Sequence, residues 1–191
     1  TNPVINNSTT PMSGEYMPNL LAATWYVATT GNNSNSCSST GSPCLTINGA
    51  LGKATAGDII RVAIGTYTTG TGTEVVLINK DITLSGGWDA SFTAQSGVSI
   101  LNVGSQRGMT VVSNMTVIVE RFYVMNGVIS DGGAGILNSG NLTVNNSTIT
   151  NNNATTSNSG GGIKNFGTLV VNNSTISSNT GNFGGGISNF G

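Results

Sequence analysis

The sequence contains no histidine, only two cysteines, and charged side chains at just 7% of its 191 positions. Without histidine a Ser–His–Asp triad cannot form, and two cysteines alone cannot supply the four ligands of a structural zinc site. The formal net charge of −1 gives no electrostatic attraction to nucleic acid. No apolar run approaches the roughly 20 residues that span a bilayer. We therefore expect no metal, no cofactor, no nucleic-acid partner and no membrane insertion.

Acidic residues are also too scattered to predict an active site. Glycoside hydrolysis needs two carboxylates facing one groove, and lyase chemistry needs a base with basic or metal partners. Only Asp58/Asp81 and Asp89/Glu120 lie loosely near one repeat length apart, and turns or strand starts explain the aspartates as structural caps. We therefore predict that the protein is not an enzyme and has no catalytic residues. The full set of acids is Glu15, Asp58, Glu74, Asp81, Asp89, Glu120 and Asp131.

The sequence does contain an internal repeat. The stretch "GILNSGNLTVNNSTITNNN" (135–153) aligns with "GIKNFGTLVVNNSTISSNT" (162–180), a weaker copy occupies 108–126, and a broken copy opens at Gly186. Successive copies are offset by 27, 27 and then 24 residues. A repeat of this length indicates a solenoid. The coinciding apolar pairs are Ile136/Ile163, Leu142/Leu169, Val144/Val171 and Ile149/Ile176.

Each copy holds short apolar alternations separated by Gly or Asn turns, too short for hairpin strands with a core of their own. One copy per turn stacks like residues at about 4.8 Å and gives a parallel sheet on every side. We therefore predict an all-β fold, a right-handed parallel β-helix; a β-sandwich would need hairpin signals that the repeats lack. Matching asparagines are expected to form side-chain ladders, one through Asn138, Asn165 and Asn189 and another through Asn145 and Asn172.

We divide the chain into an extended N-terminal arm and connector at 1–23 and the β-helix at 24–191. Its first coils, 24–107, are irregular, and the regular repeats occupy 108–191. Strands are expected in 24–30, 58–68 and 74–92. Between the first two, Ile47, Ala50, Leu51 and Ala54 have helical spacing before Gly57. We expect a short helix there that caps the open end of the stacked core.

Residues 24–191 resemble a known family. The stretch from "WYVATTGNNSNSC" to "AIGTYT" resembles the opening of bacterial secreted right-handed parallel β-helix repeat proteins. The "GGGI" and "ISSN" pairs are similar to the GGxI and FxxN repeats of polymorphic outer-membrane and adhesin-type proteins. The resemblance implies an exported surface protein. This sequence departs from the family in one respect, since it does not include the long carboxyl-terminal region that usually carries a barrel or anchor.

Two further features agree with export. Cys37 and Cys44 enclose the short loop "CSSTGSPC", in which a disulfide is geometrically easy, although two free thiols are the alternative. The chain begins at Thr1 and not at Met, so we expect that a leader has been removed. The predicted location is extracellular or at the cell surface.

The two ends of the sequence contain halves of one repeat. The chain stops at "GGGISNFG", whereas the intact copy "GGGIKNFG" continues into "TLVVNNSTIS". The N-terminal segment Val4, Ile5, Asn6, Asn7, Ser8, Thr9 matches 170–175 of that continuation. We therefore predict that the arm of one subunit completes the last coil of another, which contributes Ile187, Asn189 and Phe190 to the interface.

The sequence leaves two main function classes open. In one, the protein joins copies of itself head to tail into an extracellular filament. In the other it is a surface adhesin, or a fragment of one, that binds surface glycans. An ice-binding face is less favoured, because threonine rows are interrupted where Val170 stands opposite Thr143. A polysaccharide-degrading enzyme is likewise less favoured.

Overall fold

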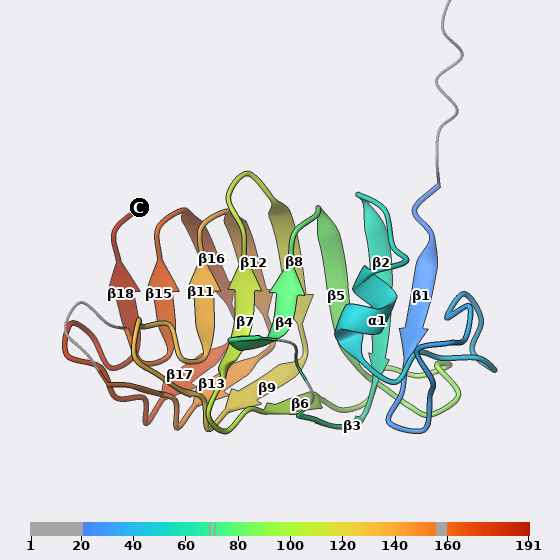
Figure 1. Cartoon of the computed structure of the whole chain (residues 1–191), viewed down its shortest axis with the longest axis horizontal. Coiled ribbons are helices and arrows are strands. Elements are labelled where there is room, and N and C mark those ends of the chain that lie inside the picture. The colour runs from blue at the N-terminus through green and yellow to red at the C-terminus, as the bar shows by residue number, and fades with distance from the viewer. Residues whose placement is uncertain (1–20, 69, 71, 156–159) are drawn as a thin grey trace, which may run out of the picture.

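Short parallel strands wind around one apolar core in the computed structural model, which describes residues 21–68, 70, 72–155 and 160–191. The protein is an all-β, right-handed parallel β-helix of about five turns with a single short helix among the described residues (Figure 1). No helix in these ranges is long and apolar enough to cross a membrane.

Three sheets form the sides of the solenoid. Sheet A contains, in order, β1 (Thr24–Val27), β2 (Asp58–Ala63), β5 (Ile82–Trp88), β8 (Thr116–Glu120), β12 (Asn141–Asn145) and β16 (Thr168–Asn172). Sheet B contains β3 (Gly65–Tyr67), β6 (Ser99–Asn102), β9 (Phe122–Met125), β13 (Thr148–Thr150) and β17 (Thr175–Ser177). Sheet C contains β4 (Glu74–Ile78), β7 (Arg107–Val111), β11 (Ile136–Asn138), β15 (Ile163–Asn165) and β18 (Ile187–Asn189). A small additional sheet pairs β10 (Val128–Ile129) with β14 (Asn153–Ala154).

The repeat alignment gives the strand register. Leu142 pairs with Leu169 in sheet A, Ile149 with Ile176 in sheet B, and Ile136 with Ile163 in sheet C. Inward side chains therefore stack in columns, and the core is one continuous cluster. Burying each such aliphatic side chain contributes about 1.5–3 kcal/mol.

Asparagine permits the sharp corner between sheets A and B. Asn146 and Asn173 occupy this corner with φ of 49° and 47°, in the left-handed region that Asn tolerates better than most residues. Arg121 has the same backbone conformation one coil earlier, with φ of 56°. The "NNS" sequence that follows each regular sheet A strand is therefore a corner motif.

The first expected strands are shorter than the sequence suggested. The segment 24–30 is a strand only to Val27, and 58–68 is interrupted at Ile64, where the chain turns from sheet A into sheet B. The expected helix is α1 (Ile47–Leu51), which has Thr46 as its N-cap and ends at Gly52, before Gly57.

Helix α1 takes the place of a strand at the N-terminal end of sheet C, and its Ile47, Ala50 and Leu51 side chains are buried in the core. The Asn48 amide donates to the Val75 carbonyl (2.9 Å), and its oxygen accepts from the Leu77 N–H (3.1 Å). These two bonds cover the edge of β4, the terminal strand of sheet C. The physical reason is that one side-chain amide can satisfy both the donor and the acceptor of a strand edge.

Candidate functional site

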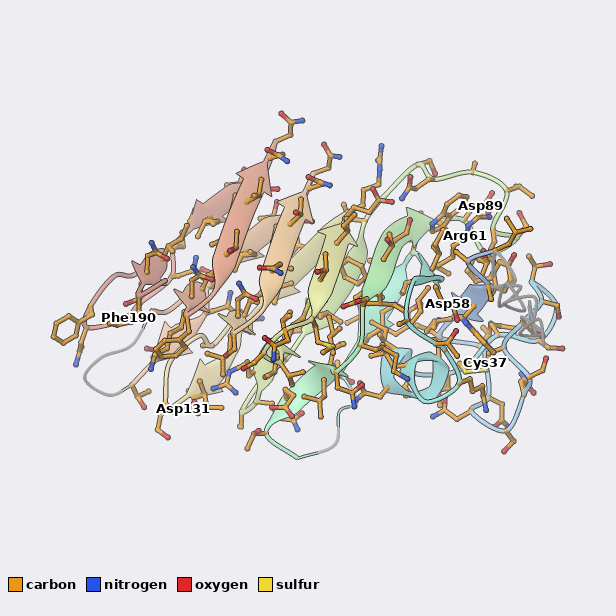
Figure 2. All side chains as sticks on the ribbon, turned by 90° about the horizontal axis from the view of Figure 1, so that it is seen from above. Cys37, Asp58, Arg61, Asp89, Asp131 and Phe190 are labelled. Carbon is orange, nitrogen blue, oxygen red and sulfur yellow. A yellow bond between two sulfur atoms is a disulfide. The ribbon has the colours of Figure 1, made fainter. Side chains whose placement is uncertain are left out.

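The two ends of the solenoid differ (Figures 1 and 2). At the end where β1 lies, here called the head, the free edge of β1 is covered by residues 37–44, here called the head loop. The Tyr26 N–H donates to the Cys37 carbonyl (2.8 Å), and the Cys44 N–H donates to the Tyr26 carbonyl (2.8 Å). The Ala28 N–H donates to the Cys44 carbonyl (3.0 Å). The edge of β1 is therefore occupied from Tyr26 onward.

The disulfide expected from the sequence closes the head loop. Cys37 and Cys44 are bonded, and both side chains are fully buried in the same core cluster as Val27 and Ile47. Figure 2 shows Cys37 at the opposite end of the molecule from Phe190. The loop therefore covers the strand edge and the end of the core together.

Asp58 stabilises the head through the hydrogen bonds of its buried carboxylate. Its carboxylate is 3% exposed and accepts four hydrogen bonds, from the Ala23 N–H, the Trp25 indole N–H, the Thr55 N–H and the Thr55 hydroxyl, all at 2.8–3.0 Å. Burial by itself raises the pKa of Asp58, but these hydrogen bonds outweigh it and lower the pKa below 3.8. Asp58 is thus an ionised structural anchor.

The opposite end, here called the tail, has no comparable cover among the described residues. The last strands are β16, β17 and β18, each paired on one side only. Ile187 is 40% exposed, whereas Ile163, directly beneath it in sheet C, is fully buried. A hollow of about 510 Å³ opens there. Its lining residues are Asn165, Gly167, Thr168, Leu169, Val171, Ile187, Asn189 and Gly191.

Polar ladders run toward this tail. The Asn138 amide donates to Asn165 Oδ1 (2.6 Å), and the Asn165 amide donates to Asn189 Oδ1 (2.6 Å). On the outer face, the Asn172 amide donates to Asn145 Oδ1 (3.0 Å). These asparagines occupy matching positions in the aligned repeats, as the sequence predicted.

Two further ladders were not singled out from the sequence. The Asn152 amide donates to Asn179 Oδ1 (3.0 Å), and the Ser147 N–H donates to Ser174 Oγ (3.0 Å). Both pairs are 27 residues apart. The alignment of the two regular copies therefore already contained the signal, hidden among many other Asn and Ser residues.

The backbone of β16 presents hydrogen-bonding groups to the open side. The Thr168 N–H donates to Gly140 of the preceding coil, and the Asn172 carbonyl accepts from Asn146 of that coil. Successive residues of a parallel strand direct their backbone groups to opposite neighbours. Leu169 and Val171 therefore direct their N–H and carbonyl groups toward the tail.

Aromatic rings line the corner between sheets C and A at the tail. Phe166 and Phe190 stack with ring centroids 5.3 Å apart and are 49% and 52% exposed. The Lys164 ammonium lies 5.2 Å from the Phe166 ring. Of the predicted interface, Ile187, Asn189 and Phe190 lie at the tail, whereas residues 4–9 lie outside the described residues.

The remaining acidic side chains of the described residues are dispersed and hydrogen-bonded. Arg107 is 3% exposed, pairs with Asp131, and has Nη1 3.7 Å from a Glu74 oxygen. Glu120 accepts from the Ser85 hydroxyl (2.6 Å) on the outside of sheet A. The described ranges contain no group of three or more His, Cys, Asp or Glu residues able to hold a metal ion. Asp89 caps a local turn by accepting from the Thr93 N–H, whereas Asp81 accepts from the Thr116 N–H of the next coil. Glu15 lies outside the described residues.

Comparisons with known proteins find a similar solved structure. No family model and no curated protein sequence matches the chain. A rhamnogalacturonan lyase structure is similar at 15% sequence identity with a TM-score of 0.44. The similarity covers 89% of this chain, which spans 63% of the length of that structure.

This comparison corrects one expectation from the sequence. We predicted that the protein is not an enzyme, but the solved structure to which it is similar is itself an enzyme, a lyase. The exclusion was wrong because it treated scattered acids in one chain as sufficient grounds to remove a whole class of protein. We therefore withdraw it.

Proposed function

We propose that this protein is the structural subunit of an extracellular filament. In this filament the N-terminal arm of one subunit adds a strand to the open tail of another. The observation that carries the proposal is the match between residues 4–9 and the chain at 170–175, where every matched position has a specific geometric role.

The inward and outward positions of the donated strand follow from the register of β16. Val171 continues a buried column above Val144, whereas Val170 pairs with Thr143 on the outer face. The matched arm residues are Ile5 for Val171 and Val4 for Val170. Ile5 therefore enters the tail hollow, Val4 faces outward, and Asn6 extends the outer ladder of Asn145 and Asn172.

The corner residues match as closely as the strand. Asn7 corresponds to Asn173, which turns the corner with a positive φ. Ser8 corresponds to Ser174, whose hydroxyl accepts the Ser147 N–H of the preceding coil. A donated Ser8 hydroxyl would accept the Ser174 N–H in the same way. Thr9 corresponds to Thr175, which pairs with Thr148 in sheet B.

Proline in the arm is compatible with this register. Pro3 corresponds to Leu169, whose backbone groups point away from the preceding strand. The missing N–H of Pro3 therefore points away from β16 and costs no bond in the joint. On the side that faces away from β16, Pro3 has no N–H to donate to a further strand.

By itself the arm gains less than its ordering costs, so strand donation alone does not hold two subunits together. About five backbone hydrogen bonds contribute about 1 kcal/mol each, and burial of Ile5 adds about 2 kcal/mol. Ordering ten residues costs about 1–2 kcal/mol per residue. A stable filament therefore also needs contact between the tail around Phe190 and the body of the next subunit.

The experiment compares four proteins by negative-stain microscopy and sedimentation: the full chain, a chain lacking residues 1–10, Ile5→Asp and Val4→Thr. The full chain and Val4→Thr should form filaments. Residue 4 faces outward, and Thr143 at the equivalent outward position of β12 shows that threonine is tolerated there. The truncated chain and Ile5→Asp should remain folded monomers. Six sheet A strands, the donated strand and the Val27–Cys44 bridge make eight layers, so the axial repeat should be about 38 Å at ~4.8 Å per layer.

Two results would overturn the proposal. Filaments of the same repeat from the truncated chain would show that the arm is not the joint. A full-length monomer whose arm is protected from proteolysis would show that each arm closes the tail of its own chain. The buried disulfide supports an extracellular location, and fractionation of producing cells would test that location directly.

A further inference from the structure

We propose that the disulfide-closed head loop is an end cap that prevents β1 from pairing directly with the tail of a second copy. The inference rests on the proposed head-to-tail assembly and deepens it, because it assigns the direction of growth to a specific structural element. If the cap opens, the free edge of β1 pairs with the β16 edge of another copy of this chain.

The two ends of sheet A would otherwise be complementary. The column of inward side chains that ends at Val171 in β16 begins at Trp25 in β1, through in-register pairs in every intervening strand. Both strands run parallel within the same sheet. An uncovered β1 would therefore offer the tail a strand in the correct direction and with an apolar residue at the correct position.

The head loop occupies the backbone groups that such pairing needs. Both the N–H and the carbonyl of Tyr26 are bonded to the loop, and so is the N–H of Ala28. The loop forms an isolated bridge with β1 at Val27–Cys44, not a strand, and it is closed internally by the Cys37 N–H, which donates to the Ser42 carbonyl (3.1 Å).

The far side of the loop cannot continue the sheet. Pro43, directly before the bridge residue, has no N–H to donate. Its carbonyl accepts from the Asn32 N–H and from the Asn35 side chain, at 3.0 and 2.8 Å. The loop thus covers a strand edge without creating a new one, which is how an edge is protected from intermolecular pairing.

The disulfide holds this cap in place. Cys37 and Cys44 provide the backbone atoms that bond β1, and their sulfur atoms fill the end of the core. Without the disulfide, Cys37 and Cys44 are held near each other only by the hydrogen bonds within the loop. We therefore expect Cys37→Ser combined with Cys44→Ser to uncover Tyr26 and Ala28 while the coils remain folded.

The test uses the chain that lacks residues 1–10, so that arm donation contributes nothing. Hydrogen exchange should show protected Tyr26 and Ala28 amides in this chain and loss of that protection after both cysteines are replaced by serine. The double serine variant should then assemble end to end, as seen by sedimentation and microscopy. Addition of Tyr26→Pro, which removes the edge N–H that would face β16, should return it to monomers. Ser38→Ala, an exposed position of the same loop, is the control that should stay capped.

Each outcome bears on the cap. Amides that stay protected in the double serine variant, or exposed amides without assembly, would overturn the proposal. Assembly that Tyr26→Pro does not suppress would show that another surface is responsible and would overturn it as well. Failure of strand donation appears separately, as filaments of the truncated chain with its disulfide intact.

Discussion

Asn165 should stabilise the solenoid more than Asn189, although both belong to one ladder. The Asn165 side chain is 2% exposed and makes three hydrogen bonds, with Asn138, Asn189 and the Gly167 carbonyl. Asn189 lies at the exposed end, where it accepts from Asn165 and donates to Gly191 at 3.3 Å. At about 1 kcal/mol per neutral hydrogen bond, Asn165→Ala should cost about 3 kcal/mol. Asn189→Ala should cost only about 1 kcal/mol, because its long bond to Gly191 is exposed and water can replace it.

Urea denaturation of the chain lacking residues 1–10 measures this difference without interference from assembly. The free energy of unfolding is obtained from circular dichroism and from tryptophan fluorescence, whose agreement checks that unfolding is two-state. Equal losses for the two variants would refute the argument, because they would show that position in the ladder does not decide the energy. A loss below about 1 kcal/mol for Asn165→Ala would show that water replaces the ladder at little cost.

The remaining predictions concern the core and the head. Ile163→Ala should lower the free energy of unfolding by about 2–5 kcal/mol, and Ile187→Ala in the same column by much less, because Ile187 is already 40% exposed; similar losses in a denaturant titration would contradict the open tail. The folded-state pKa of Asp58 lies below its unfolded value, so its contribution to stability is present above about pH 4 and is lost as pH falls through the folded pKa. Urea unfolding between pH 6 and about pH 3 should show this loss in the native chain and a shallower dependence in Asp58→Asn; identical slopes would exclude Asp58 as the anchor.

The periodic part of the structure could be predicted from the sequence. Ile136 and Ile163, or Leu142 and Leu169, occur at a constant offset, and one such residue per turn can be buried only when successive turns stack in register. The pairing of Asn138 with Asn165 follows from the same stacking. The two cysteines were sufficient to suggest the disulfide, since their separation of seven residues allows a short closed loop.

The ends of the solenoid were decided only by the tertiary structure. The sequence suggested that α1 caps the core, but it did not predict that the head loop covers β1 or that Asn48 bonds the edge of β4. For the proposed joint, the sequence left open whether Val4 or Ile5 would face inward, and our proposal of Ile5 is based on the register of β16. The physical reason is that a repeat constrains only positions with a neighbour on both sides. At an end, the partner of a strand is whatever non-periodic segment reaches it, and no spacing in the sequence specifies that contact.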